Sequence, residues 1–384
     1  MRVAISTSVI QRGKSGVGQY LLALVRALLD RPGRRDLVLF VLEQDLPLFG
    51  FASGRAEIVA VPERFRPAVR NIAWHQAVLP SLVRRLQIDV LHVPSYRRML
   101  ASHPCALVAT IHDLAPFHVR AKYDLARMFY GRVVVKHLAR RQDQVIAISG
   151  NTARDIERFF GIPASRQNII LNGIDHARFL PGPRAEAKAE AASRWQLGAP
   201  FFLFISRLEH PAKNHVRLIE AFNRFKDKTG SAWLLALGGS DWHGADVVRA
   251  AAAQSPFAKD IRFLGFVDDA ALPGLYRAAD AMVYPSLFEG FGLPPAEAMA
   301  CGCPVLSSSR GSLAEVVADA ADLIEPEDVA SITAGLKRMA SDQALRERLT
   351  LAGLANARRF DWDANAARVL EVYRAALERR PVAA

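Results

Sequence analysis

Short apolar runs alternate with longer amphipathic stretches along the whole chain. In the first half, compact runs rich in β-branched residues predict strands, and the segment Gly18–Asp30 repeats Leu and Val at the i, i+3 or i+4 spacing of a helix. Ser149 is placed to cap a further helix over Thr152–Phe160. The predicted strands are Met1–Ser6, Leu37–Leu42, Ile88–Val93, Ala106–His112, Gln144–Ile148 and Ile169–Leu171.

The same alternation starts again at Pro200. The predicted strands of this second series are Phe201–Ile205, Trp233–Leu237, Ile261–Gly265, Ala281–Tyr284 and Val305–Ser307. Its predicted helices are Val216–Lys226, Pro295–Ala300 and, near the end of the chain, Asp363–Arg379. Between the two series, residues 181–200 are rich in Pro, Ala and Gly and poor in large apolar residues, which predicts the connection between two domains.

Strands that alternate with helices in this way predict the α/β class, with two doubly wound, Rossmann-like parallel sheets. We expect the first domain over residues 1–182 and the second over 183–362, with the terminal helix 363–379 packed back on the first. Such sheets bind ligands beyond the carboxyl ends of their strands. The two domains are expected to face each other across a cleft, and the functional residues to lie in strand-to-helix loops.

Composition narrows the class of protein. Of the 384 residues, 51% are apolar and 23% are charged, as in an ordinary globular enzyme. No run approaches the ~20 apolar residues of a membrane span, and the N-terminal segment MRVAISTSVI has no signal-peptide pattern. Three cysteines argue against a disulfide scaffold. A location in the cytoplasm is therefore expected.

Charge is distributed unevenly. The formal net charge is +12, and residues 1–185 carry 27 Lys and Arg against 13 Asp and Glu, whereas residues 186–384 carry 23 against 25. No nucleic-acid motif accompanies this charge, so no nucleic-acid partner is expected. Segment 64–86 mixes apolar residues with five arginines, which is compatible with peripheral contact to an anionic membrane. The alternative is an amphipathic helix that packs on its own domain and breaks near Pro80.

The loop after the first strand, QRGKSGVG at residues 11–18, opens a helix. Backbone amides at a helix N-terminus can hold a phosphate, and glycine allows close approach. A P-loop is excluded because Ser8 stands where its first glycine is required, and the glycine spacing does not match the dinucleotide fingerprint. Glu43 at the end of the second strand could mimic the ribose-binding acid of a dehydrogenase, or be a solvated strand end.

Two further loops carry candidate polar groups. His112, followed by Asp113, ends a predicted strand and is placed to hydrogen-bond a sugar or phosphate oxygen. The alternative for His112 is a structural histidine. In the second domain, SRLEHPAKN at residues 206–214 follows a strand. Arg207 as a fork and Lys213 as a point charge can converge on a diphosphate and offset its growing charge as it leaves. The alternative for Arg207 and Lys213 is two solvated surface cations.

The segment YPSLFEGFGLPPAEAMA at residues 284–300 is the most informative. Glu289 and Glu297 flank a glycine-rich turn, and Glu297 falls in the first turn of a predicted helix. Carboxylates accept bonds from vicinal diols, which both a sugar ring and a ribose present. The amides from Gly290 to Leu293 can bind phosphate or sugar oxygens. Alternatively, Glu297 only complements the helix dipole and Glu289 is a loop charge.

These motifs together resemble the retaining glycosyltransferases of family 4, the group 1 enzymes of GT-B fold. The resemblance covers nearly the whole chain. It rests on GxG-Y after the first strand, HDL at 112–114, AIS at 147–149, NGID at 172–175, SRL…KN at 206–214, LGF at 264–266 and EGFGLPPAEAMACGCPV at 289–305. EGFGLPP, with WHQ at 74–76 and LHVP at 91–94, is similar to bacterial O-antigen and exopolysaccharide enzymes, many of which use GDP-mannose.

The resemblance implies a role for each matching residue. The catalytic group would be His112 beside the donor sugar, Arg207 and Lys213 on the diphosphate, and Glu289 on the sugar hydroxyls. The donor-binding group would add Gly16, Gly18, Val267, Gly290, Phe291, Gly292, Leu293 and Glu297, with Glu297 on the ribose and Gly265-Phe266-Val267 along the base. Two residues depart from the family: Ala296 replaces a larger apolar residue, and His75 stands where relatives often carry Glu.

The expected substrates are a nucleotide-diphosphate sugar, with GDP-mannose favoured, and a glycan or polyprenyl-diphosphate-linked acceptor. No cofactor and no metal site are expected, because the one metal-binding-like pattern, Asp361-Trp362-Asp363, precedes the last helix and is typical of an N-cap. No carboxylate is placed to bind the anomeric carbon covalently. The expected reaction is therefore same-face attack by the acceptor hydroxyl, with the leaving phosphate taking its proton.

Three alternatives stay open at this point. A UDP-sugar could replace GDP-mannose as the donor of the same kind of enzyme. An NAD-dependent oxidoreductase would instead bind a nicotinamide nucleotide. A non-catalytic nucleotide-binding module would keep the ligand site without transfer.

Overall fold

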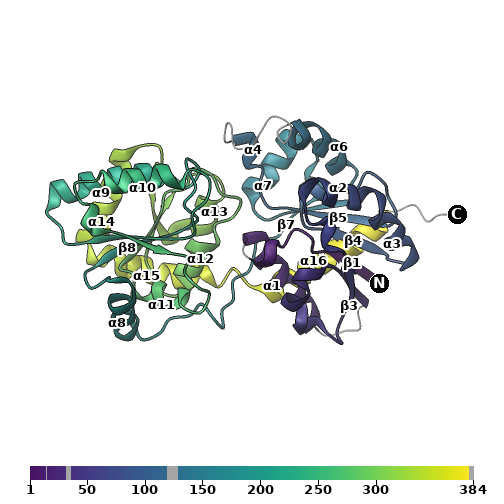
Figure 1. Cartoon of the computed structure of the whole chain (residues 1–384), viewed down its shortest axis with the longest axis horizontal. Coiled ribbons are helices and arrows are strands. Elements are labelled where there is room, and N and C mark those ends of the chain that lie inside the picture. Colours follow the sequence, from purple (N-terminus) through teal and green to yellow (C-terminus); the bar gives the residue numbers. More distant parts are fainter. Residues whose placement is uncertain (14, 32–35, 119–128, 380–384) are drawn as a thin grey trace. The chain divides into compact units, whose positions relative to one another are not determined.

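A computed structural model describes residues 1–13, 15–31, 36–118 and 129–379 of the chain. The chain forms two compact units, of which unit 1 comprises 1–173 and 361–384 and unit 2 comprises 174–360. Each unit is built on a parallel sheet, so the predicted α/β class with two Rossmann-like sheets is confirmed (Figure 1).

The sheet of unit 1 has the order β3-β2-β1-β4-β5-β6-β7. Its central strand β1 pairs in parallel with β2 on one side and β4 on the other, so that Val3 lies opposite both Leu37 and Val90. Its strands are β1 Arg2–Ser6, β2 Asp36–Leu42, β3 Glu57–Val61, β4 Val90–Val93, β5 Ala106–Ile111, β6 Gln144–Ala147 and β7 Gln167–Ile169.

Helices cover both faces of this sheet. Alternate strand residues point to opposite faces, and those on one face, such as Leu39, share a core with α1 and α16. Those on the other face, such as Phe40 and Ala109, pack under α2, α3 and α6. The helices are α1 Gly16–Asp30, α2 Ala68–Ala77, α3 Leu79–Arg85, α4 Ala115–His118, α6 Val135–Arg140, α7 Gly150–Asp155 and α16 Trp362–Glu378. Thus the last helix of the chain belongs to the core of unit 1.

The sheet of unit 2 has the order β10-β9-β8-β11-β12-β13, again parallel. Its strands are β8 Phe201–Ile205, β9 Leu234–Gly238, β10 Ile261–Gly265, β11 Ala281–Tyr284, β12 Val305–Ser308 and β13 Ala321–Ile324. Its helices are α8 Arg184–Trp195, α9 His215–Thr229, α10 Ala245–Ala253, α11 Leu272–Ala278, α12 Leu293–Ala300, α13 Leu313–Val317, α14 Val329–Ser341 and α15 Gln343–Ala357.

Three of the differences from the sequence-based expectation concern α8, β3 and β13. Residues 181–200, expected as a connection, contain helix α8, which packs against α11 in unit 2. Its alanines supply helix propensity, and the buried Ala187 and Ala191 need no large side chain for contact. The edge strands β3 and β13 were not predicted, because they are short and partly exposed. Among the described residues, no helix is both long and apolar enough to cross a bilayer.

Candidate active site

Two loops of unit 2 leave neighbouring strands and are bonded to each other. Strands β8 and β11 pair in parallel, so the loops that follow them begin at the same edge of the sheet. The backbone N–H of Leu287 donates to the carbonyl of Ala212 at 3.0 Å. This bond joins the loop that carries Lys213 to the loop that carries Glu289.

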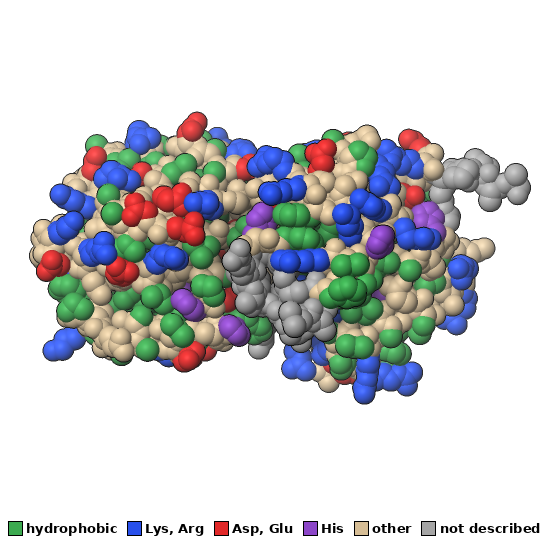
Figure 2. Space-filling model, turned by 90° about the horizontal axis from the view of Figure 1, so that it is seen from above, with side chains coloured by type: hydrophobic (Ala, Val, Ile, Leu, Met, Phe, Trp, Pro, Cys, Tyr) green, Lys and Arg blue, Asp and Glu red, His purple; other side chains and the backbone are tan. Residues whose placement is uncertain are grey.

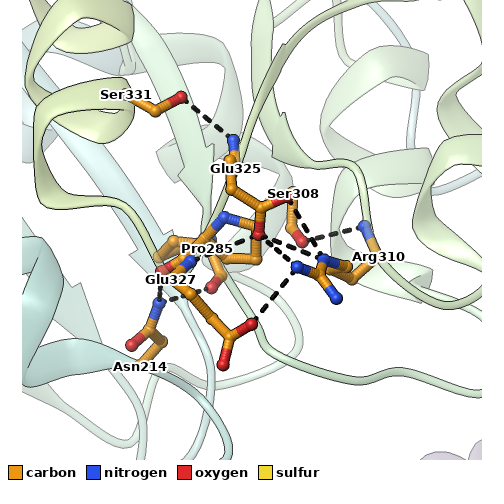
Figure 3. Close-up of polar contacts among 8 residues, drawn as sticks. Asn214, Pro285, Ser308, Arg310, Glu325, Glu327 and Ser331 are labelled. Carbon is orange, nitrogen blue, oxygen red and sulfur yellow. Dashed lines mark hydrogen bonds and ion pairs between the residues drawn. The ribbon is translucent and has the colours of Figure 1, made fainter.

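The side chain of Asn214 also connects these loops. Its buried side-chain amide donates to the carbonyl oxygens of Pro285 at 3.0 Å and Pro326 at 2.7 Å (Figure 3). The residue lies in the left-handed region with φ 65°, which Asn tolerates better than most side chains. Asn214 therefore ties the ends of β8, β11 and β13 together.

Lys213 and Glu289 form the central ion pair of this edge. The Lys213 Nζ donates to Glu289 Oε1 at 2.5 Å, and both side chains are largely buried. The hydroxyl of Tyr284, the last residue of β11, donates to the same carboxylate oxygen at 3.0 Å. Burial beside Glu289 raises the pKa of the Tyr284 phenol well above its ordinary value, so Tyr284 stays a hydrogen-bond donor.

Arg207 is held between an aromatic ring and a carboxylate. Its guanidinium lies over the ring of Trp242, 4.7 Å from the centroid, and donates to Glu209 Oε2 at 3.1 Å. Trp242 follows β9, and its N–H donates to the carbonyl of Leu208, which joins the β8 and β9 loops. Both cations proposed for the diphosphate thus lie on one loop, each beside a carboxylate.

Glu297 lies in helix α12 and accepts a 3.0 Å hydrogen bond from the hydroxyl of Tyr276 in α11. Burial raises the pKa of the Glu297 carboxyl to about 7, although the Tyr276 bond and the charge of Arg178 oppose the shift. The carboxyl therefore titrates near neutral pH, where a ligand that donates hydrogen bonds would favour its ionised form.

The glycine-rich turn before α12 is fixed by close packing. Gly292 has φ 111°, and a Cβ there would lie 2.6 Å from Leu313. The Ser312 hydroxyl reaches the carbonyl oxygens of Glu289 at 2.8 Å and Phe291 at 2.9 Å. The Phe291 ring is buried and meets Phe360 edge-on at 5.5 Å. The side chain of Phe291 is thus part of the core, which leaves its backbone for any ligand contact.

The segment that carries Ser312 is itself anchored by an exposed ion cluster. Arg310 donates to Glu325 at 2.8 Å and to Glu327 at 3.2 Å (Figure 3). Its backbone N–H donates to Ser308 Oγ, and the N–H of Glu325 donates to Ser331 Oγ. The ends of β12 and β13 are thereby joined beside the glycine-rich turn.

Backbones approach closely at the ends of β8, β9 and β10. A Cβ on Gly239 would lie 1.9 Å from the carbonyl oxygen of Ser206, so no other residue fits there. The N–H of Gly239 donates to the carbonyl of Gly265 at 2.7 Å. Val267 lies next to this junction, against Gly238. The segment proposed to line the base therefore adjoins the loop of Arg207.

In unit 1, His112 directly follows β5 and is held in one orientation. Its ring meets the ring of Tyr20 edge-on at 4.7 Å, and burial lowers its pKa to about 4, against the opposing effects of Asp113 and a bond to the Pro94 carbonyl. Its Nε2 is buried and has no hydrogen-bond partner among the residues that the structure describes. Nδ1 therefore donates to Pro94, and the neutral ring leaves Nε2 as a free acceptor.

Gly16 and Gly18, in the turn between β1 and α1, differ in the space around their α-carbons. Ser15 caps α1 by accepting from the N–H of Gly18 at 3.1 Å. A Cβ on Gly18 would lie 2.5 Å from the carbonyl oxygen of Ile10, whereas no atom of the described residues lies within 4 Å of a Cβ on Gly16. Packing explains Gly18, and open space at the helix N-terminus explains how Gly16 could admit a phosphate.

The structure thus groups the predicted residues by unit. Arg207, Lys213, Glu289 and Glu297 lie at the carboxyl edge of the unit 2 sheet or in the helix that follows it, and Gly16 and His112 lie at the carboxyl edge of the unit 1 sheet. Asp361 accepts from the N–H of Ala364 at 2.6 Å, which makes it the N-cap of α16. Within the described ranges, no group of three or more His, Cys, Asp or Glu could hold a metal ion.

Other site residues were not predicted from the sequence. Tyr276, Tyr284, Glu209, Trp242 and Ser312 contact the candidate residues, and their only local signal is a position at or after a strand end or in an adjacent helix. His75, noted as a departure from the family, is fully buried between Ser6 and the carbonyl of Asn71. Burial lowers its pKa to about 3, so its hydrogen-bonded ring stays neutral.

Comparison with known families matches both halves of the chain. The family described as "Glycosyltransferase Family 4" matches residues 14–178, and "Glycosyl transferases group 1" matches residues 186–354. Together these matches extend through both units and include the loops of Lys213, Glu289 and Glu297.

Individual proteins resemble the chain over most of its length. "O-antigen chain mannosyltransferase B" of Escherichia coli is 28% identical, and the match covers 97% of this chain and 100% of that protein. "D-inositol 3-phosphate glycosyltransferase" of Nocardia farcinica is 30% identical over 87% of this chain and 73% of its own. Among solved structures, sucrose-phosphate synthase from Thermosynechococcus elongatus superposes with a TM-score of 0.77 at 20% identity, over 97% of this chain and 98% of that one.

Proposed function

The chain belongs to the glycosyltransferases of family 4, or group 1, and from this premise we propose that it transfers mannose from GDP-mannose to a hydroxyl of a growing cell-surface polysaccharide. The acceptor is a glycan or a polyprenyl-diphosphate-linked glycan. Similarity over the full length of an O-antigen mannosyltransferase supports the choice of sugar and pathway.

The observation that carries the proposal is the arrangement of two cations and two carboxylates around one edge of the unit 2 sheet. Arg207 and Lys213 lie on the loop after β8, and the turn that carries Glu289 is bonded to that loop. A diphosphate that leaves the sugar gains negative charge, which preorganised cations stabilise. In this proposal Arg207 and Lys213 supply that stabilisation without a metal ion.

Glu289 and Glu297 would hold the two diols of the donor. Glu289 already accepts from Lys213 and Tyr284 through Oε1, which leaves Oε2 for a sugar hydroxyl. Glu297 accepts only from Tyr276 among the described residues, and it can accept further bonds from the ribose. The ion pair of Lys213 with Glu289 would then couple recognition of the sugar to recognition of its diphosphate.

His112 would act on the donor sugar by accepting a hydrogen bond rather than by carrying charge. Within the described part of the chain, Nε2 of its neutral ring is an acceptor without a donor, and the Pro94 carbonyl and the Tyr20 ring hold the ring's orientation. A neutral acceptor can orient a sugar hydroxyl without competing for the diphosphate. His112 is therefore assigned to positioning the donor at the reaction centre.

The proposed transfer retains the configuration of the anomeric carbon. The acceptor oxygen approaches on the face from which the diphosphate departs. The bond from the anomeric carbon to the phosphate oxygen breaks, the bond to the acceptor oxygen forms, and the acceptor proton passes to the leaving phosphate. No enzyme carboxylate is bonded to the sugar in this route, unlike that of retaining glycosidases.

A thermal-shift screen of GDP-, UDP-, ADP- and dTDP-sugars tests the donor. We expect GDP-mannose near 100 times its Kd to raise the Tm by about 5 °C or more. Glu297→Gln should abolish the shift, while Glu347→Gln, a matched change at an exposed position of α15, should keep it. A shift with a UDP-sugar alone would replace the donor and leave the reaction class standing.

Transfer itself is tested by incubating the enzyme with the stabilising donor and short mannose-containing acceptors. The product should carry the anomeric configuration of the donor by NMR, and a chelator should leave the rate unchanged. Release of the nucleotide without any glycosidic product on any acceptor, or absence of a shift with every nucleotide sugar, would contradict the proposed function. An inverted product or a chelator-sensitive rate would overturn the corresponding part of the mechanism.

A further inference from the structure

We propose that unit 1 docks on an anionic lipid bilayer through one face of its helical layer, and this goes beyond the transfer reaction proposed above. The face is formed by the outward side of α2 with the arginines at the end of α3, and by the outward side of the helical stretch 129–140. We call it the basic face.

The two parts of the basic face cover the same side of one sheet. Trp74 of α2 contacts Phe40 in a core that also contains Leu107, and Leu138 of α6 shares a core with Ala109. Leu107 and Ala109 are two residues apart in β5, so they point to the same side of the sheet. The outward faces of α2 and α6 therefore both point away from that side.

A short turn joins the two helices laterally. The turn Tyr96–Arg98 contacts both α2 and α6. On one side Arg98 donates to Asn71 of α2, and on the other the hydroxyl of Tyr130 donates to the carbonyl of Arg97. The basic face is thus continuous across this turn.

The outward side of α2 combines apolar and basic residues. Val69 is 78% exposed and Val78 is 38% exposed, next to the exposed Arg70. The end of α3 adds the exposed Arg84 and Arg85. An apolar side chain this exposed is not explained by packing within the unit, where Trp74 already supplies the inward contact.

The stretch 129–140 repeats the same combination. Tyr130–Val134 and α6 run on as one helical segment. Phe129 is 63% exposed and Val133 is 43% exposed, and the exposed Arg132, His137 and Arg140 follow at helical spacing. A stripe of Phe, Val and Arg on one side of a helix is typical of a surface that inserts shallowly among lipid headgroups.

Charge favours an anionic partner. Residues 64–88 contain five arginines and residues 129–142 contain four Lys and Arg, and neither segment contains an acid. Unit 1 as a whole has 29 Lys and Arg against 16 Asp and Glu, whereas unit 2 has 21 against 22. Figure 2 shows basic and hydrophobic side chains gathered together on the visible side of the lobe that contains α2 and α6. Nucleic acid would explain the charge but not the exposed Val69, Phe129 and Val133.

Vesicle flotation tests the proposal with the full chain. We expect it to float with phosphatidylcholine vesicles that contain phosphatidylglycerol, and to stay in solution with phosphatidylcholine alone. Each basic residue near an anionic leaflet strengthens binding up to about fivefold. The triple variant Arg70→Gln/Arg84→Gln/Arg85→Gln should therefore bind roughly 100-fold more weakly.

The matched control removes the same charge from the opposite side of the sheet. Arg26 in α1 and Arg368 and Arg374 in α16 are also exposed. Their triple change to Gln should leave most of the affinity intact. The double variant Val69→Ser/Phe129→Ser should lose binding most clearly at high salt, where the electrostatic part is screened. Thermal-shift response to the nucleotide sugar should be unchanged in all three variants, which separates this proposal from the proposed function.

Three outcomes would overturn the docking surface. The first is that the chain does not float with anionic vesicles even at low salt. The second is that the two triple variants lose binding equally, so that only net charge matters. The third is that a DNA or RNA duplex competes fully with the vesicles while the Val69→Ser/Phe129→Ser variant binds as tightly as the parent chain, which would assign the face to a nucleic acid.

Discussion

Each cation of the candidate site is held by a carboxylate and an aromatic side chain. Lys213 donates to Glu289, which also accepts from the Tyr284 hydroxyl. Arg207 donates to Glu209 and lies over the ring of Trp242. Such partners fix a long, flexible side chain in one place, which lowers the entropy lost when a diphosphate binds. The identity of the supporting residues therefore bears on affinity as much as the cations do.

Trp242 is expected to position Arg207. Trp242→Ala removes a cation–π contact worth about 0.5–1 kcal/mol at an exposed site, so the Kd for the nucleotide sugar should rise roughly two- to fivefold. Because Trp242 is 55% exposed, stability should change little. Calorimetric titration measures the Kd, and Trp242→Phe, which keeps an aromatic face, should recover part of the loss. Equal affinity in all three proteins would show that the ring does not contribute.

Glu297 is expected to make donor binding depend on pH. Its pKa of about 7 means that much of the carboxyl is protonated just below neutrality, and ribose hydroxyls bind the ionised form better. Affinity for the nucleotide sugar should fall about tenfold per pH unit below 7, with release of nearly one proton on binding. Calorimetry in buffers of different ionisation enthalpy counts that proton. Glu297→Gln should bind weakly at every pH, and proton release that persists in this variant would argue against Glu297 as its source.

At the scale of elements, the loops that follow strands carry the chemistry, and tight packing fixes their paths. Gly18, Gly239 and Gly292 each stand where a Cβ would clash with backbone or a core side chain. Beyond the strand ends, where the sheet no longer pairs the backbone, the side chains of Asn214 and Ser312 donate to backbone carbonyl oxygens of the loops. Loops of this kind hold their polar groups in place, because their own backbone groups are satisfied inside the unit.

The β1–α1 turn permits a matched pair of substitutions. Gly18→Ala would push a methyl group against the Ile10 carbonyl, so it should destabilise the protein by roughly 1–3 kcal/mol. The methyl group of Gly16→Ala would have no described atom within 4 Å, so this change should leave stability unchanged or slightly higher. Denaturant unfolding measures both. If Gly16 admits the diphosphate, Gly16→Ala should nevertheless weaken nucleotide-sugar binding, and unchanged binding would make this glycine dispensable for the donor.

At the scale of the whole molecule, the two units differ in their buried titratable groups. Unit 1 holds His75, His92 and His112, whose pKa values burial lowers to about 3, 3 and 4. Unit 2 holds His215, lowered to about 3, and Glu297, raised to about 7. A lowered histidine pKa destabilises the fold as the pH falls below 6.5, because the unfolded chain then binds the proton first. A raised carboxyl pKa has the opposite effect: the fold becomes more stable as the pH falls from 7 to 4.5, because the folded chain then binds the proton first.

Mild acid should therefore weaken unit 1 more than unit 2. One pH unit below the ordinary histidine pKa, the three histidines of unit 1 together lower the free energy of unfolding by about 4 kcal/mol. In unit 2 the stabilising effect of Glu297 offsets the destabilising effect of His215. Hydrogen exchange of peptides from β4 and β5, compared with β8 and β9, should show selective acceleration in unit 1 between about pH 7.5 and 5.5 after correction for the intrinsic rate. Equal acceleration in both sheets would contradict this assignment of protons.

The apolar pattern predicted most strands and the α/β class because a buried parallel strand needs a continuous apolar run, and that run is visible locally. The same reasoning failed for α8, whose contacts are made by alanine, and for the edge strands β3 and β13, which bury too little to need such a run. The motifs placed the candidate residues in loops, since residue types with usable chemistry followed predicted strands.

The sequence by itself therefore determined the class of fold, the membership of family 4 and the residues with suitable chemistry. Only the tertiary structure decided which of them meet. Lys213 and Glu289 form an ion pair although they are 76 residues apart in the sequence, and Glu297 and Tyr276 are hydrogen-bonded although they are 21 residues apart. It also decided the environment that moves the pKa of Glu297 to about 7 and leaves His112 neutral. The physical reason is that helix and strand patterns depend on neighbours along the chain, whereas burial and hydrogen bonding depend on residues that only folding brings close.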